Sequence, residues 1–311
     1  MSSLQTALDE YLALRRTLGF KLRETGSLLQ RFVEFAGQAK ATHITTELAL
    51  KWANLATDAQ PRHRARCLNA VRHFAAYCRP NDPRTVVPPK GLLPEHYRRQ
   101  DPYLYTDAQI RDLLQAARQL HPTTGLRPCT YATLFALYAA TGLRTREAVR
   151  LDREDVDLNK GVLTIRDTKF GKSRYVPLHP STNRALQRYA KRRDRQRPDP
   201  QDRSFFISDR AGRLSTWSVH RTFITLSHRI GLRSAGDRRG PRIHDLRHRL
   251  AIKTLLNWHR RGIDVERHLP ELSAFLGHSE ISHTYWYLTA TPQLLHYTLQ
   301  RVERSKRRGR R

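Results

Sequence analysis

Cysteine and long apolar runs are scarce in this chain of 311 residues. Its three cysteines, Cys67, Cys78 and Cys129, are odd in number, widely spaced and without a CxxC pair. That pattern argues against a disulfide framework or a cysteine-based zinc site, and it predicts buried thiols in a reducing compartment. The most apolar run, residues 131–143, is too short to span a bilayer, and no signal-peptide pattern opens the chain. We therefore expect a cytoplasmic protein that does not bind membrane.

Acidic residues are also in short supply. The chain has 28 Asp and Glu against 57 Lys and Arg, which gives a formal net charge of +29. The basic residues recur along the whole length, whereas a typical small domain carries a net charge of only about 2–8. A field of this strength attracts polyanions, so the charge indicates DNA or RNA as the partner.

Helical periodicity and proline content predict two domains. Residues 1–80 hold four segments with helical apolar spacing, which indicates an all-helical N-terminal domain. Residues 81–101 carry several prolines and no helical period, so we expect a linker there. Residues 102–297 combine helical segments with a β-rich stretch at 155–178, which predicts a mainly α protein with a small β-sheet (α+β). Residues 298–311 form a basic tail.

The sequence HDLRH forms one candidate site. His244 and Arg247 are three residues apart, so they share a helix face near its N-terminus. An anion there would meet an imidazole, a guanidinium and the helix N-terminal field together. His244 and His248 superficially match the HExxH zinc spacing, but Asp245 is one methylene shorter than the required Glu. A solvated basic helix face remains the alternative interpretation.

A second candidate is the sequence TGLRTRE. Gly142 ends an apolar helix, Arg144 falls in or just after the turn, and Glu147 lies three residues further on, where it can orient that arginine. An arginine held this way is better fixed than the many surface arginines of this chain. The alternative is an ordinary Arg–Glu surface pair, which contributes little.

The sequence TKFGK supplies a lysine between two expected strands. Lys169 lies at the tip of the predicted turn, which Gly171 permits. A lysine at such a tip can reach a leaving group and donate a proton to it. The alternative is a turn residue that contacts backbone phosphate.

Two tyrosines stand close together in LGHSEISHTYWYL, residues 276–288. Tyr285 and Tyr287 are two positions apart, so on a helix they point to different faces, and one can pack while the other reacts. His278 precedes Tyr287 by nine residues. Aromatic packing of the whole cluster is the alternative.

Taken in chain order, TGLRxxE, the turn lysine, HDLRH, LGHSEIS and the tyrosine nine residues after His278 resemble the tyrosine recombinase (phage integrase) family. The resemblance covers residues 102–295. It extends more weakly to the N-terminal helices, which look like that family's core-binding (SAM-like) domain. It implies two domains that clamp DNA. The TYWYLTATP ending is similar to recombinases of bacterial mobile elements, which suggests integration or transposition.

The resemblance also implies a role for each matching residue. The implied catalytic set is Arg144, Lys169, His244, Arg247, His278 and Tyr287, supported by Glu147. The two arginines would hold the scissile phosphate, and the two histidines would assist, with His244 favoured for proton transfer. The lysine would protonate the leaving 5′-oxygen, and the tyrosine would attack. Tyr285 and Trp286 would be packing partners.

Attack by a phenol on a phosphodiester builds negative charge, which these cations would stabilise in place of a metal. A phosphotyrosine intermediate conserves the bond energy, so rejoining needs no ATP. Neither GxxxxGK[ST] nor a carboxylate cluster for Mg²⁺ occurs in the sequence. We therefore expect a site-specific DNA recombinase of the integrase or transposase type that acts through a 3′-phosphotyrosine without cofactor or metal.

The expected partner is double-stranded DNA, so the protein should be nucleoid-associated. Exchange of strands needs two duplexes, which implies a homotetramer on DNA. Candidate DNA contacts are Arg62, Arg64 and Arg66 on the fourth N-terminal helix, with Lys172 and Arg174 after the turn. Many phosphate contacts would make binding strongly dependent on salt.

Two other functions stay open at this stage. A type IB topoisomerase-like enzyme would relax DNA with the same residues, and relaxation against two-site recombination assays would separate the two. A non-catalytic DNA-binding regulator would keep the fold without cleavage, and trapping of a phosphotyrosine would exclude it.

Overall fold

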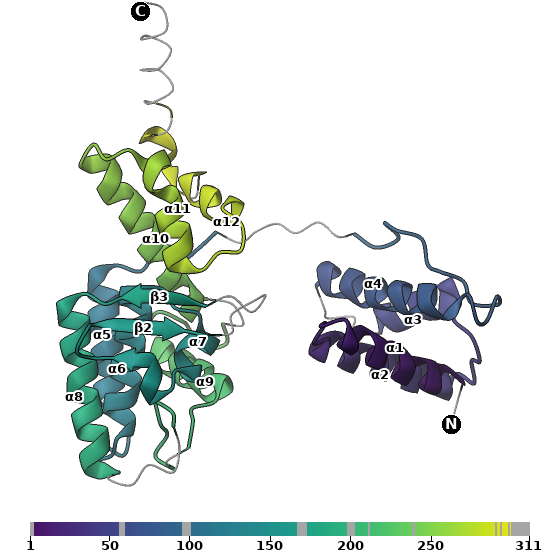
Figure 1. Ribbon diagram of the computed structural model, residues 1–311, viewed down its shortest axis with the longest axis horizontal. Helices are drawn as coiled ribbons and strands as arrows, with labels where there is room; N and C mark the ends of the chain where they lie inside the picture. The colour runs from purple at the N-terminus through teal and green to yellow at the C-terminus, as the bar shows by residue number, and fades with distance from the viewer. Residues whose placement is uncertain are drawn as a thin grey trace, which may run out of the picture. The chain divides into compact units, whose positions relative to one another are not determined.

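The computed structural model describes residues 3–55, 60–94, 101–166, 173–197, 203–210, 212–237, 240–289, 291–292, 294–297 and 299. The chain forms two compact units, Met1–Gln100 and Asp101–Arg311, both drawn in Figure 1. Lys169, Lys172 and the basic tail apart from Leu299 lie outside the described residues. No helix in the described ranges is long and apolar enough to cross a membrane.

The first unit contains the four helices that the sequence predicts. They are α1 (Ser3–Thr17), α2 (Arg23–Gln38), α3 (Thr46–Asn54) and α4 (Pro61–Cys78). Thr45 caps α3 by accepting a hydrogen bond from the Leu48 N–H, and Pro61 occupies the first turn of α4, where its missing N–H costs nothing. Phe32 and Phe74 lie fully buried in the core.

The expected linker is largely part of this unit. The Val86 N–H donates to the Ile44 carbonyl (2.8 Å), and Thr85 is buried. Val87 and Leu93 pack on the helical core. The prediction of a linker from residue 81 was therefore wrong up to residue 94: its prolines remove helical periodicity but do not prevent the chain from packing.

The second unit is mainly helical with one small sheet, as the sequence predicts. Its helices and 3₁₀ turns are α5 (Asp107–Arg118), α6 (Arg127–Thr141), α7 (Thr145–Arg150), η1 (Arg153–Asp155), α8 (Pro180–Gln196), α9 (Thr216–Arg229), α10 (Ile243–Arg260), α11 (Val265–Leu276), α12 (Ser282–Tyr285) and η3 (Trp286–Thr289). Helix α6 lies at the centre, in contact with α5, α8 and α10 (Figure 1). It is buried along most of its length, as its apolar sequence indicates.

The sheet has three antiparallel strands in the order β1-β2-β3. They are β1 (Val156–Asp157), β2 (Val162–Ile165) and β3 (Arg174–Pro177). Leu163 and Val176 face each other in register and are both fully buried. Helix α11 contacts β3, which brings the C-terminal helices to the edge of the sheet.

The cysteines are free thiols. Cys67 and Cys78 are buried in the first unit, where burial raises the pKa of Cys78 to about 11. Cys129 is only partly buried, so the expectation of a buried thiol was wrong for that residue.

Candidate active site

The C-terminal ends of two helices supply main-chain carbonyls to the site. Helices α6 and α11 each stop at a glycine with left-handed backbone, Gly142 (φ 62°) and Gly277 (φ 67°). A residue in this conformation turns the chain away from the helix axis and leaves the last carbonyls without intrahelical partners. These carbonyls carry the negative end of the helix dipole, so they attract cationic donors.

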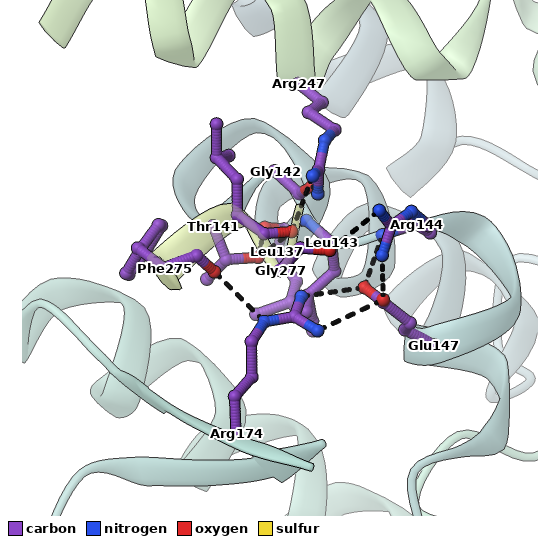
Figure 2. Close-up of polar contacts among 11 residues, drawn as sticks. Leu137, Thr141, Gly142, Leu143, Arg144, Glu147, Arg174, Arg247, Phe275 and Gly277 are labelled. Carbon is purple, nitrogen blue, oxygen red and sulfur yellow. Dashed lines mark hydrogen bonds and ion pairs between the residues drawn. The ribbon is translucent and has the colours of Figure 1, made fainter. Parts of the chain in front are cut away.

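Three arginines from different elements donate to three successive carbonyls at the end of α11 (Figure 2). The contacts are Arg174 Nε to Phe275 O (3.0 Å), Arg247 Nη2 to Leu276 O (2.5 Å) and Arg144 Nη2 to Gly277 O (2.9 Å). The arginines come from β3, α10 and the residue that precedes α7. The LGH turn therefore gathers the guanidinium groups through its backbone.

The Glu147 carboxylate links two of these arginines. It accepts from Arg144 Nη1 at 2.7 Å and from both terminal nitrogens of Arg174 at 3.1 and 2.9 Å. It also accepts from the Arg144 N–H at 3.0 Å. Burial alone would raise the pKa of Glu147, but the hydrogen bonds from Arg174 and Arg144 outweigh it, so the net pKa lies below its ordinary value. Glu147 is therefore an ionised support for both arginines.

Within the described residues, main-chain carbonyls and not a carboxylate accept the hydrogen bonds of Arg247. Its side chain is 1% exposed, and it donates to the Gly142 carbonyl (2.8 Å) as well as to Leu276. Burial and the nearby Arg144 lower the pKa of Arg247 to about 10, so it still carries its charge at neutral pH. Three guanidinium groups share the site with one carboxylate, which pairs with two of them, so the site has an excess of positive charge.

His244 and His278 lie near the arginines of the site. Although part of the His244 surface is open to solvent, protein surrounds most of its ring, and this burial together with Arg247 lowers its pKa to about 4. Burial, Arg247 and Arg144 lower the pKa of His278 to about 3. His278 Nδ1 lies 2.7 Å from Thr284 Oγ1. Both imidazoles are thus neutral at neutral pH and ready to gain a proton when an anion arrives.

The two tyrosines occupy opposite environments. The Tyr287 ring lies beside the His278 ring with centroids 6.3 Å apart, and the residue is 1% exposed. Tyr285 is 47% exposed. The expectation that Tyr285 packs was therefore wrong. Tyr287 lies buried in η3 in this conformation, and its role as the nucleophile stays a prediction. Tyr287 thus lies beside His278 and interacts electrostatically with Arg247.

The Phage integrase family model matches residues 104–293. This chain belongs to the phage integrase family. It is 48% identical to the predicted integrase/recombinase y4rB of Sinorhizobium fredii over 98% of each chain. It is a tyrosine-type site-specific recombinase that acts on DNA.

Solved structures of integrases share the fold. The Tn1549 transposon integrase in complex with transposon right end DNA matches with a TM-score of 0.69 at 16% identity, over 98% of this chain and 99% of that one. A lambda integrase tetramer bound to a Holliday junction matches with a TM-score of 0.60 at 18% identity, over 89% of this chain and 77% of that one. These likenesses agree with a mainly helical architecture with a small sheet.

The other predicted site residues are spread over the recombinase. The side chain of Arg174 is 12% exposed and is bound to Glu147 and to the Phe275 carbonyl, and its contact with DNA stays a prediction. On α4, Arg62 and Arg66 are exposed, Arg66 pairs with Glu24 at 3.3 Å, and Arg64 donates to Asn54. Their contact with DNA remains a prediction.

Metal ligands are not grouped in the described ranges, where no cluster of three or more His, Cys, Asp or Glu side chains could hold an ion. His244 and His248 do lie together, with ring centroids 4.7 Å apart. His248 Nδ1 is instead 2.9 Å from the Tyr287 hydroxyl. The second histidine of HDLRH, His248, thus contacts Tyr287.

Gly277→Ala should reduce DNA cleavage about a hundredfold, because the new methyl group displaces Arg174 from a reacting centre that tolerates little misplacement. Its Cβ would fall 2.5 Å from Arg174 Nη1, and that guanidinium is pinned by Glu147 and Phe275. Gly262→Ala is the matched control, since Gly262 has the same left-handed φ of 68° and open space around it. Gly262→Ala should lose roughly 1 kcal/mol of stability from its backbone conformation alone, and Gly277→Ala should lose more because its methyl group also displaces Arg174. Equal cleavage by the two variants would contradict the prediction.

Acid should destabilise the recombinase in part through His278. Its folded pKa lies below the unfolded value of about 6.5, so its contribution to stability is present above that pH and is lost progressively as the pH falls toward about 3. We expect wild type to lose roughly 1 kcal/mol more than His278→Asn between about pH 7.5 and pH 5, with partial exposure reducing the full linkage value. Urea unfolding of both proteins at the two pH values measures the change in the free energy of unfolding. Identical losses in the two proteins would count against it.

Proposed function

We propose that this recombinase cuts and rejoins double-stranded DNA through a covalent bond between Tyr287 and a 3′-phosphate, without ATP or a metal cofactor. The observation that carries the proposal is the gathering of Arg144, Arg174 and Arg247 at the end of α11, where Glu147 pairs with only the first two. A phosphodiester would balance the remaining charge. Arg144, whose side chain is 35% exposed, is the arginine best placed to meet it.

We assign a residue to each step of the proposed cleavage reaction. The Tyr287 oxygen bonds to phosphorus, and the phenol proton passes to His244, which is neutral at neutral pH. Charge on the non-bridging oxygens is stabilised by Arg144, Arg247 and His278. The bond from phosphorus to the 5′-oxygen breaks, and Lys169 protonates that oxygen. Rejoining reverses these steps with a new 5′-hydroxyl as the nucleophile.

We also propose that four protomers act together on two duplexes. Exchange of strands between two sites needs a nucleophile at each of four strands. The fold shared with a lambda integrase crystallised as a tetramer on a Holliday junction supports this assembly. The net charge of +29 supports duplex DNA as the partner and predicts that binding weakens steeply with salt.

The test is to locate the covalent bond. Wild-type protein is incubated with nicked suicide duplexes made from the DNA that flanks its gene and from a random library, in EDTA and without nucleotide. The adduct is digested and its peptides are mapped by mass spectrometry. The proposal expects a 3′-phosphate on Tyr287 with a yield that EDTA does not change. An adduct on Tyr285, or one that forms only with added metal, would contradict it.

A further inference from the structure

The proposed nucleophile is shielded in this conformation. Tyr287 is 1% exposed and belongs to the apolar cluster that α10 and α11 form with residues such as Leu255 and Leu276. A phenol in that position cannot approach a phosphodiester on the surface of a bound duplex. Tyr287 must therefore move before it can react.

A specific hydrogen bond holds the phenol there. The Tyr287 hydroxyl lies 2.9 Å from Nδ1 of His248, which is itself only 7% exposed. Burial of a hydroxyl is unfavourable unless it is hydrogen-bonded, so this contact stabilises the shielded position. It joins α10 to η3 across 39 residues of sequence.

The rings around His248 fix its orientation. Its ring meets the Trp286 ring edge-on at 5.3 Å and the His244 ring edge-on at 4.7 Å. His248 is thus one helical turn from a residue of the proposed catalytic set and faces the tyrosine. Nothing in the proposed transfer steps uses His248, although it lies in HDLRH beside Arg247.

We propose that His248 is a positioning residue that stores Tyr287 in an inactive, buried position, and that cleavage begins when this hydrogen bond breaks and η3 moves. This inference rests on Tyr287 being the nucleophile. Release of Tyr287 would break this bond, so its loss by mutation should favour the released state. Weakening it should raise the released fraction about tenfold, the factor expected for one buried hydrogen bond.

The test measures the accessibility of Tyr287 in the full chain without DNA, so it does not depend on activity. Tetranitromethane labels exposed phenols, and mass spectrometry reads each tyrosine separately. His248→Phe removes the hydrogen-bonding partner of Tyr287 and keeps a ring, whereas His248→Asn keeps a polar atom near the Nδ1 position. Tyr285 is 47% exposed, so its nitration shows that the reagent is active. Tyr138 is 1% exposed in α6, so its nitration would show that the protein has unfolded.

We expect nitration of Tyr287 to rise about tenfold in His248→Phe and to return toward wild type in His248→Asn, with Tyr285 and Tyr138 unchanged. Unchanged nitration of Tyr287 in a folded His248→Phe protein would overturn the proposal. If Tyr138 also becomes labelled, His248→Phe is unfolded and a second variant is needed. Tyr287→Phe removes the same hydrogen bond from the other side, and hydrogen exchange of residues 282–289 is then measured in that variant. Faster exchange there supports the stored state, and unchanged exchange overturns it.

Discussion

Tyr287→Phe should form no covalent adduct with DNA, a loss of about 10⁴-fold or more, because the attacking oxygen is gone. The ring remains, so the core that Tyr287 shares with α10 and α11 should stay packed. DNA binding, measured by gel shift in parallel, should stay within about twofold of wild type. Denaturing gels of a nicked suicide duplex measure the adduct.

Tyr285→Phe is the matched control for this variant. Tyr285 lies two residues earlier, ends α12 and is 47% exposed. A surface change of this kind is worth about 0.5 kcal/mol or less, so the adduct should form within about twofold of wild type. If Tyr285→Phe is the variant that loses the adduct, the assignment of the nucleophile is wrong.

Arg247→Lys should slow strand cleavage by about 10²–10³-fold, the cost of removing one preorganised donor from a transition state. Lysine keeps the positive charge but lacks the planar fork with which Arg247 reaches both Gly142 and Leu276. The helix ends would separate from α10, and a phosphate would lose a fixed donor. Single-turnover cleavage at saturating protein measures the rate apart from binding.

Arg249→Lys tests whether that effect is specific. Arg249 lies on the same helix, is 13% exposed at its side chain, donates to the Tyr105 carbonyl and pairs with Asp107. It contacts none of the gathered carbonyls in the described structure. Its rate should remain within about threefold of wild type, since it carries only a structural pair. Equal slowing in both variants would mean that damage to α10, not loss of a phosphate donor, causes the effect.

Local periodicity was enough to predict much of the site. Helical spacing placed His244 and Arg247 on one face of a helix, and the structure has both on the first turns of α10. The TGLR sequence predicted a helix end, and Gly142 does end α6. These features depend on neighbouring residues and on glycine's backbone freedom, which a sequence displays directly.

Contacts between distant segments were not predictable in the same way. Arg174 looked like one more basic residue after a turn, yet its partners are Glu147, 27 residues before it, and the carbonyl of Phe275, 101 residues after it. A main-chain carbonyl has no signature in a sequence.

The tyrosine pair shows a further limit. Two residues two positions apart face different ways, but the spacing does not say which one turns inward. That choice depends on the change from α12 to η3 at Trp286 and on the partner that His248 offers across 39 residues. Neither the change of helix type nor the partner is visible in LGHSEISHTYWYL alone.

The arginines at the end of α11 bind main-chain atoms, so the side chains there can vary. Every amino acid supplies the same carbonyl, so substitutions at Phe275 or Leu276 leave unchanged the acceptors that Arg174 and Arg247 use. Side chains there are free to adapt to neighbouring packing as long as Gly277 keeps the turn. Descendants of this chain could therefore diverge widely around the turn while the arginines that bind its carbonyls kept their spacing.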